Sequence, residues 1–124
     1  MSTSLLGPPN LRSPDLGSLD REAALTRVGG DEALLKEIAG LFLEHHRDWI
    51  GELREAAARG DVKRIERMAH TLKGSVANFG ARNAVDASVD LKNSARSSDL
   101  LGVSTALGAL ELALETLCRD LATL

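Results

Sequence analysis

The segment DLLGVSTALGALELALETLCRDLATL, residues 99–124, carries the clearest apolar pattern in the chain. Its large apolar residues recur at steps of three and four, which is the spacing that places side chains on one face of a helix. These residues are Val103, Leu107, Leu110, Leu114, Leu117, Leu121 and Leu124. The pattern predicts a long amphipathic helix that buries one stripe against other helices.

Earlier segments repeat this pattern and end at recognisable caps. A helix over 82–96 is rich in small residues, and a helix over 61–79 places Val62, Ile65, Ala69, Leu72, Val76 and Phe79 on one face. A third runs from Asp31 to Ala58 with Leu34, Leu35, Ile38, Phe42, Trp49 and Leu53. We expect Asp31, Asp61 and one of residues 97–99 to be N-caps, and Gly60 to end a helix.

A shorter helix is predicted over 18–28, with Ser18 as its N-cap and Gly29-Gly30 after its end. Four long helices with short connections favour an antiparallel bundle. The predicted fold class is therefore all-α: an up-down four-helix bundle with a short extra N-terminal helix. All three prolines fall within residues 1–17, so we expect 1–17 to be a flexible tail and 18–124 to be the bundle.

The composition of the 124 residues narrows the possible functions. A formal net charge of −3 is atypical of a broad nucleic-acid surface. The single cysteine, Cys118, excludes an internal disulfide and a cysteine-based zinc site, and we expect it to be an inert packing residue. We found no apolar run near the roughly 20 residues of a membrane span and no signal region, so we expect no membrane partner and a cytoplasmic location.

One histidine does not fit the apolar face of its helix. With Ala69 and Leu72 inward, His70 is rotated by about 100° per residue and is predicted to face solvent. Lys73 and Gly74 lie one turn later. Because glycine inside a helix costs about 1 kcal/mol relative to alanine, Gly74 indicates that something approaches the backbone closely.

An exposed imidazole beside an ammonium group suits phosphoryl chemistry. Neutral imidazole is nucleophilic near neutral pH, and Lys73 is placed to stabilise the oxygens of a transferring phosphoryl group. The chain has no glycine-rich nucleotide loop, so we expect no ATP site and no enzymatic turnover of its own. The phosphoryl donor is then another protein.

The stretch AHTLKGS (69–75), followed by NFGA (78–81), resembles the signature of histidine phosphotransfer domains of bacterial phosphorelays. The resemblance extends over 18–124, through Leu19-Asp20, GGD at 29–31, FLE at 42–44 and RGD at 59–61. It implies that His70 accepts a phosphoryl group from a receiver-domain aspartate and passes it to another receiver. Mg²⁺ would then be held by the receiver, and the chain itself would need no cofactor.

The same resemblance assigns roles around His70. Lys73 would stabilise the phosphate, Gly74 would admit the loops of the receiver, and Ser75 would orient its neighbours. We expect receiver domains, and a sensor or hybrid histidine kinase, to dock on a monomeric bundle. The residues expected to form this docking surface are Gly74, Ser75, Ala77, Arg67, Lys92 and Arg96.

The chain departs from the family pattern at Lys92. Members often carry Gln or an acidic residue there, which hydrogen-bonds the second imidazole nitrogen, whereas a lysine can only donate. Either Asn93, a backbone carbonyl or water holds the imidazole, or Lys92 is a second phosphate contact. Arg96, one turn further, extends a basic rim in this interpretation.

Other functions fit parts of the pattern. The bundle could be the phosphoacceptor domain of a larger kinase, although a chain that begins at Met1 without a kinase domain favours a free-standing protein or an excised module. It could also dock a receiver without being phosphorylated. His45 and His46 are adjacent and do not share a helix face, which argues against a metal site.

Overall fold

The computed structural model describes residues 18–124, so the predicted tail over 1–17 lies outside the described residues. Within 18–124 the chain forms helices and no strand, as expected for an all-α protein. The helices are α1 (Arg21–Arg27), α2 (Glu32–Arg59), α3 (Val62–Ala77), α4 (Arg82–Arg96) and α5 (Leu100–Leu121).

Most helix ends lie at the caps that the sequence predicts. Asp31, Asp61 and Asp99 each accept a hydrogen bond from the backbone N–H three residues later, at 3.0, 3.2 and 3.0 Å. Gly60 adopts a left-handed conformation and ends α2. These contacts satisfy the backbone groups that a helix terminus otherwise leaves unpaired.

The predicted N-cap of α1 is wrong. Asp20, not Ser18, caps this helix, because the Asp20 carboxylate accepts from the backbone N–H of Ala23 at 3.1 Å. The backbone N–H of Asp20 also donates to the carbonyl of Phe79 at 2.8 Å. Docking of this segment on the α3–α4 connection therefore decides where α1 begins, and Ser18 is buried ahead of it.

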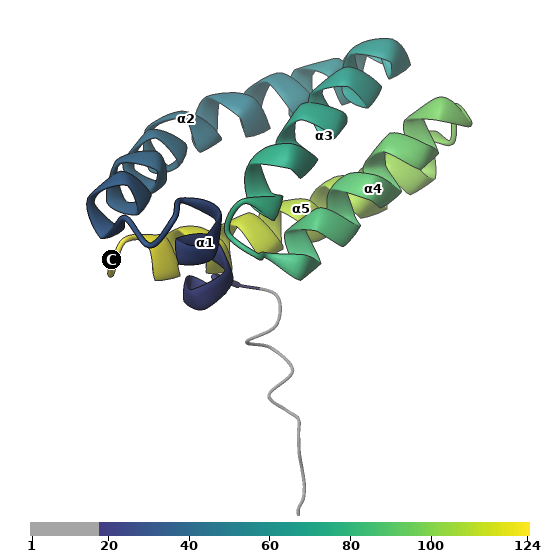
Figure 1. Ribbon diagram of the computed structural model, residues 1–124. Coiled ribbons are helices and arrows are strands. Elements are labelled where there is room, and N and C mark those ends of the chain that lie inside the picture. Colours follow the sequence, from purple (N-terminus) through teal and green to yellow (C-terminus); the bar gives the residue numbers. More distant parts are fainter. Residues whose placement is uncertain (1–17) are drawn as a thin grey trace, which may run out of the picture.

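The four long helices form a ring in which each contacts two neighbours (Figure 1). α2 and α4 both contact α3 and α5, and α3 lies diagonally opposite α5. The short helix α1 contacts α2 at one end of the bundle. This arrangement leaves the outer face of α3 between α2 on one side and α4 on the other.

The core is mainly aliphatic, because the chain has only two Phe, one Trp and no Tyr. The apolar stripe of α5 is buried from Val103 to Leu121, and Leu124 lies half-buried after the helix ends. Two apolar positions differ from expectation. Leu34 is exposed, and Phe79 lies beyond the end of α3 in the turn to α4, where it is 1 % exposed against Phe42.

Small side chains bring α3 and α4 close together. Ala84, Ser88 and Ala95 on α4 are fully buried, as is Ala69 on α3. The Ser88 hydroxyl donates to the carbonyl of Ala84 at 2.8 Å, so this buried polar group is satisfied within its own helix. The contact between α3 and α4 is the most extensive in the fold and sets their register firmly.

Ion pairs join three of the four neighbouring helix pairs. Arg64 of α3 donates to Glu52 of α2 at 2.8 Å, and Arg54 of α2 hydrogen-bonds Glu111 of α5. The hydrogen bond from Arg54 lowers the pKa of the Glu111 carboxyl. In the third pair, Arg96 of α4 binds Glu66, which lies about one helical turn before His70 on α3.

α5 is more apolar than the sequence analysis expected. Its 22 residues have a mean hydropathy of 1.5 in the most apolar window, which is sufficient by length and composition to cross a membrane. The core helix of a bundle meets the same criteria, and α5 buries one whole side against α2 and α4. Cys118 on this helix is half-buried, and burial raises the pKa of its thiol to about 11, which makes it a poor nucleophile.

The turn after α3 gives a first prediction. Gly80 has φ of 65°, and a Cβ added there would lie 2.6 Å from the Cβ of Asp20. Gly60 has nearly the same φ, 68°, with no atom near the position of an added Cβ. We expect Gly60→Ala to lower the free energy of unfolding by about 1–2 kcal/mol, the cost of a left-handed alanine.

Gly80→Ala should cost at least about 1 kcal/mol more than Gly60→Ala, because the steric clash adds to the backbone strain. Urea denaturation of the two variants beside the wild type measures both values. Equal losses for the two variants would contradict the close packing of α1 on the α3–α4 turn.

Candidate functional site

His70 lies in the middle of α3 and is exposed, as the sequence predicts. Ala69 and Leu72 on either side are 0 % and 4 % exposed, which fixes the rotation of the helix. Within residues 18–124, neither ring nitrogen of His70 has a hydrogen-bond or ion-pair partner. The imidazole is therefore free to react with, or to bind, a group brought by another molecule.

The neighbours of His70 on α3 divide between two sides of the helix. At about 100° per residue, Glu66, Lys73 and Ala77 lie on the same side as His70, toward α4. Gly74 points most directly to solvent, and a Cβ added there would meet nothing within 4 Å. No side chain therefore covers the backbone of α3 at Gly74, and this open space is what the sequence led us to expect there.

Charged residues of α4 lie beside the His70 side of α3. Arg96 Nε donates to Glu66 Oε2 at 2.8 Å, and a second guanidinium nitrogen lies 2.7 Å from the same oxygen. Since the two helices are antiparallel, one turn inward from this pair brings His70 opposite Lys92. Lys92, at the position where the chain departs from the family pattern, is therefore on the side of α4 that faces His70.

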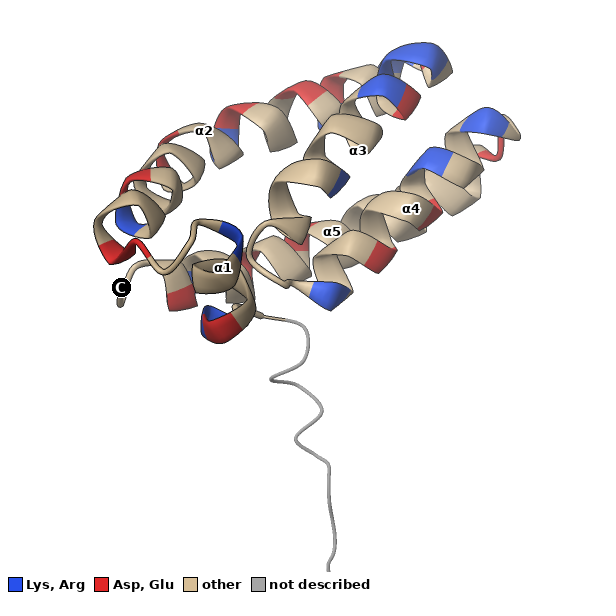
Figure 2. Cartoon of the chain, in the orientation of Figure 1, with Lys and Arg blue, Asp and Glu red and all other residues tan. Residues whose placement is uncertain are grey.

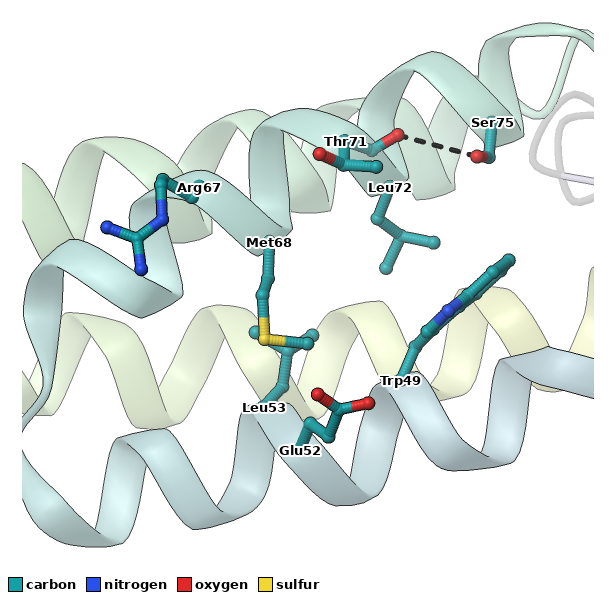
Figure 3. A pocket seen from close by; sticks show the side chains of 8 residues that line it. All are labelled: Trp49, Glu52, Leu53, Arg67, Met68, Thr71, Leu72 and Ser75. Carbon is teal, nitrogen blue, oxygen red and sulfur yellow. Dashed lines mark hydrogen bonds between the residues drawn. The ribbon is translucent and has the colours of Figure 1, made fainter.

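The other two predicted docking residues lie on the side of α3 that faces α2. Arg67 and Ser75 line a groove between α2 and α3 with a volume of about 430 Å³ (Figure 3). The Ser75 hydroxyl donates to the carbonyl of Thr71 at 3.4 Å, within its own helix. The structure thus places Lys73, Ala77, Lys92 and Arg96 on the α4 side of His70. Arg67, one helical turn before His70, borders it on the α2 side, whereas Ser75 lies farther around the helix.

This α2–α3 groove was not identified from the sequence. Its floor is apolar: Met68 points toward Leu53, and Trp49 rises from α2 beside Leu72 (Figure 3). From its spacing Trp49 is expected to be a core or semi-core residue, and its indole is half-buried. The spacing within α2 gives no signal of the groove, because the facing residue Met68 comes from α3.

The adjacent histidines of α2 have structural contacts. His46 is half-buried, stacks on Phe42 with ring centroids 6.1 Å apart, and lies 3.0 Å from the carbonyl of Leu43 through Nδ1. His45 stacks on Trp49 at 6.1 Å. In the part of the chain that the structure describes, no three His, Cys, Asp or Glu side chains gather as a metal site would require.

The fold and site together define a class: helical bundles that present a solvent-exposed histidine to a partner. Residues 37–120, more than half of the chain, match the Hpt domain family, and the chain belongs to that family. Neither the curated proteins nor the solved structures contain a significant match. Hpt domains are phosphoryl carriers of phosphorelays, and they interact with receiver domains and histidine kinases.

Proposed function

We propose that this chain accepts a phosphoryl group on His70 from the aspartate of one receiver domain and passes it to the aspartate of another. The observation that carries the proposal is the exposed imidazole in the middle of α3, which has no partner in residues 18–124 and stands beside Lys73 and the bare backbone of Gly74. Membership of the Hpt family supports the same reaction class.

The chemistry needs only groups that the two proteins supply. The lone pair of a neutral imidazole nitrogen of His70 attacks phosphorus, the N–P bond forms, and the P–O bond to the receiver aspartate breaks. The bonding electron pair leaves with the carboxylate, and the other ring nitrogen keeps its proton. In this proposal Lys73 offsets charge on the phosphoryl oxygens, and Mg²⁺ is held by the receiver.

Transfer assays with a panel of radiolabelled phospho-receiver domains test the proposal. We expect acid-labile label to move to the full chain from at least one receiver within minutes, and to move on to a second receiver when that is added. A folded chain that binds receivers but acquires no label from any of them would contradict the carrier function. In that case the chain would be a docking module only.

A second prediction concerns the open space above Gly74. Gly74→Leu should weaken receiver binding at least tenfold, because the new side chain occupies the space over which the partner would approach. The fold should be retained, since nothing lies within 4 Å of the added Cβ and leucine is the better helix former. Titration calorimetry measures the affinity, and thermal melting followed by circular dichroism measures the stability.

Gly108→Leu is the matched control. Gly108 is also helical, and an added Cβ there also meets nothing, but it lies on α5, diagonally opposite α3. We expect this variant to bind receivers as the wild type does. Equal loss of binding in both variants would remove the α3 face as the docking surface.

A further inference from the structure

Lys92 and Lys73 occupy equivalent places on the facing sides of α4 and α3. Each lies about 80° around its helix from a fully buried residue eight positions before it, Ala84 for Lys92 and Ile65 for Lys73. Both side chains are half-buried. A lysine at such a position lays its apolar stem along the neighbouring helix and carries the ammonium group outward to solvent. His70 lies on the α4 side of α3, opposite Lys92.

The charges on the facing sides of α3 and α4 do not cancel. Glu66 and Arg96 neutralise each other through their ion pair. Lys73 and Lys92 have no ion-pair or hydrogen-bond partner within residues 18–124. The α3–α4 side of His70 therefore carries two unpaired ammonium groups in a chain whose formal net charge is −3.

The acidic residues of α4 lie elsewhere. Asp86 and Asp90 line the groove on the far side of the helix, against α5. Along α4, Figure 2 shows acidic residues in the middle and basic residues at both ends, Arg82 at the start and Lys92 and Arg96 toward the C-terminal end. No carboxylate on α4 is therefore placed to neutralise Lys92, and an incoming anion would meet its full charge.

We propose that Lys92 is a second phosphate-binding residue, which holds the phosphoryl group on His70 after transfer. This inference rests on the proposed function. A lysine has no acceptor atom, so Lys92 cannot receive a hydrogen bond from the imidazole N–H, but it can donate to phosphoryl oxygens. Contact from one cation on α3, Lys73, and one on α4, Lys92, stabilises phospho-His70 relative to the free histidine.

The stabilisation changes an equilibrium that can be measured. In a mixture of the chain with one receiver and a fixed amount of phosphate label, the ratio of phospho-His70 to phospho-aspartate reports the relative stability of the two states. We expect Lys92→Gln to lower this ratio about tenfold. A tenfold change corresponds to about 1.4 kcal/mol, the size of one hydrogen bond to a charged group.

Two further variants separate a direct contact from general effects. Lys92→Arg keeps a cation at the same position, and we expect its ratio within about twofold of the wild type. Lys63→Gln removes an exposed positive charge from the start of α3, about 10 Å along the helix from His70 at 1.5 Å per residue. We expect this control to leave the ratio unchanged. Melting curves of all variants verify that each is folded.

The outcomes are distinguishable. If the wild type acquires no label, the proposed function fails and this inference fails with it. If the wild type is labelled and Lys92→Gln has the wild-type ratio, only the role of Lys92 is overturned. An equal fall in Lys63→Gln would also overturn it, because it would show an effect of net charge rather than a contact at position 92.

Discussion

Replacement of His70 by glutamine is expected to reduce phosphoryl label on the chain to background while the fold and receiver binding persist. The side chain is exposed and has no partner within residues 18–124, so its removal breaks no native contact. Glutamine is a good helix former and keeps a polar side chain of similar reach, but its amide is not a nucleophile. Transfer assays, binding assays and melting curves on the same preparation measure the three properties.

His45→Gln is the matched control for this variant. His45 is the other exposed histidine of the described chain, and it stacks on Trp49 of the same helix. The same substitution there should leave labelling at the wild-type level, because the ring lies on α2 rather than beside Lys73. Residual label on His70→Gln, or loss of label on His45→Gln, would place the phosphoacceptor elsewhere.

The largest expected effect on stability is at Phe79. Its side chain is 1 % exposed and packs edge-to-face on Phe42 with ring centroids 5.5 Å apart. Removing a buried phenyl ring costs about 3–5 kcal/mol through lost transfer energy and the cavity left behind. Since the free energy of unfolding of a small domain is about 5–15 kcal/mol in total, Phe79→Ala should remove a large share of the stability.

Urea denaturation followed by circular dichroism measures this loss. Leu112→Ala is the control, because Leu112 on α5 is 68 % exposed and its truncation should change the free energy of unfolding by less than about 0.5 kcal/mol. A loss below about 1 kcal/mol for Phe79→Ala would mean that the turn after α3 is not part of the core. The structure instead makes this turn the place where α1, α3 and α4 meet.

Local sequence determines much of the fold because caps and apolar spacing act over a few residues. Asp31, Gly60 and Asp61 were predicted as helix ends and are confirmed. Ser18 failed as a cap because α1 begins where Asp20 docks on the carbonyl of Phe79, a contact between segments about sixty residues apart. Tertiary contacts of that kind leave no periodic signal.

In the site, too, some features follow from the sequence of one helix and others depend on how two helices pack. The outward rotation of His70 follows from its buried neighbours, and the open space at Gly74 agrees with the expected access. The pairing of Glu66 with Arg96 depends on the register of two helices, which spacing within either helix does not determine. The groove between α2 and α3 also depends on the register of two helices, since Trp49 and Met68 come from different helices.

The most direct test of the phosphocarrier assignment is to locate the phosphoryl group on the wild-type chain after transfer from a receiver. Mass spectrometry of peptides, prepared at alkaline pH where phosphohistidine survives, identifies the modified residue. The account predicts one phosphorylated residue, His70, with label that is lost in acid. Label on His45, on His46 or on a hydroxyl residue would contradict it, as would a folded chain that no receiver phosphorylates.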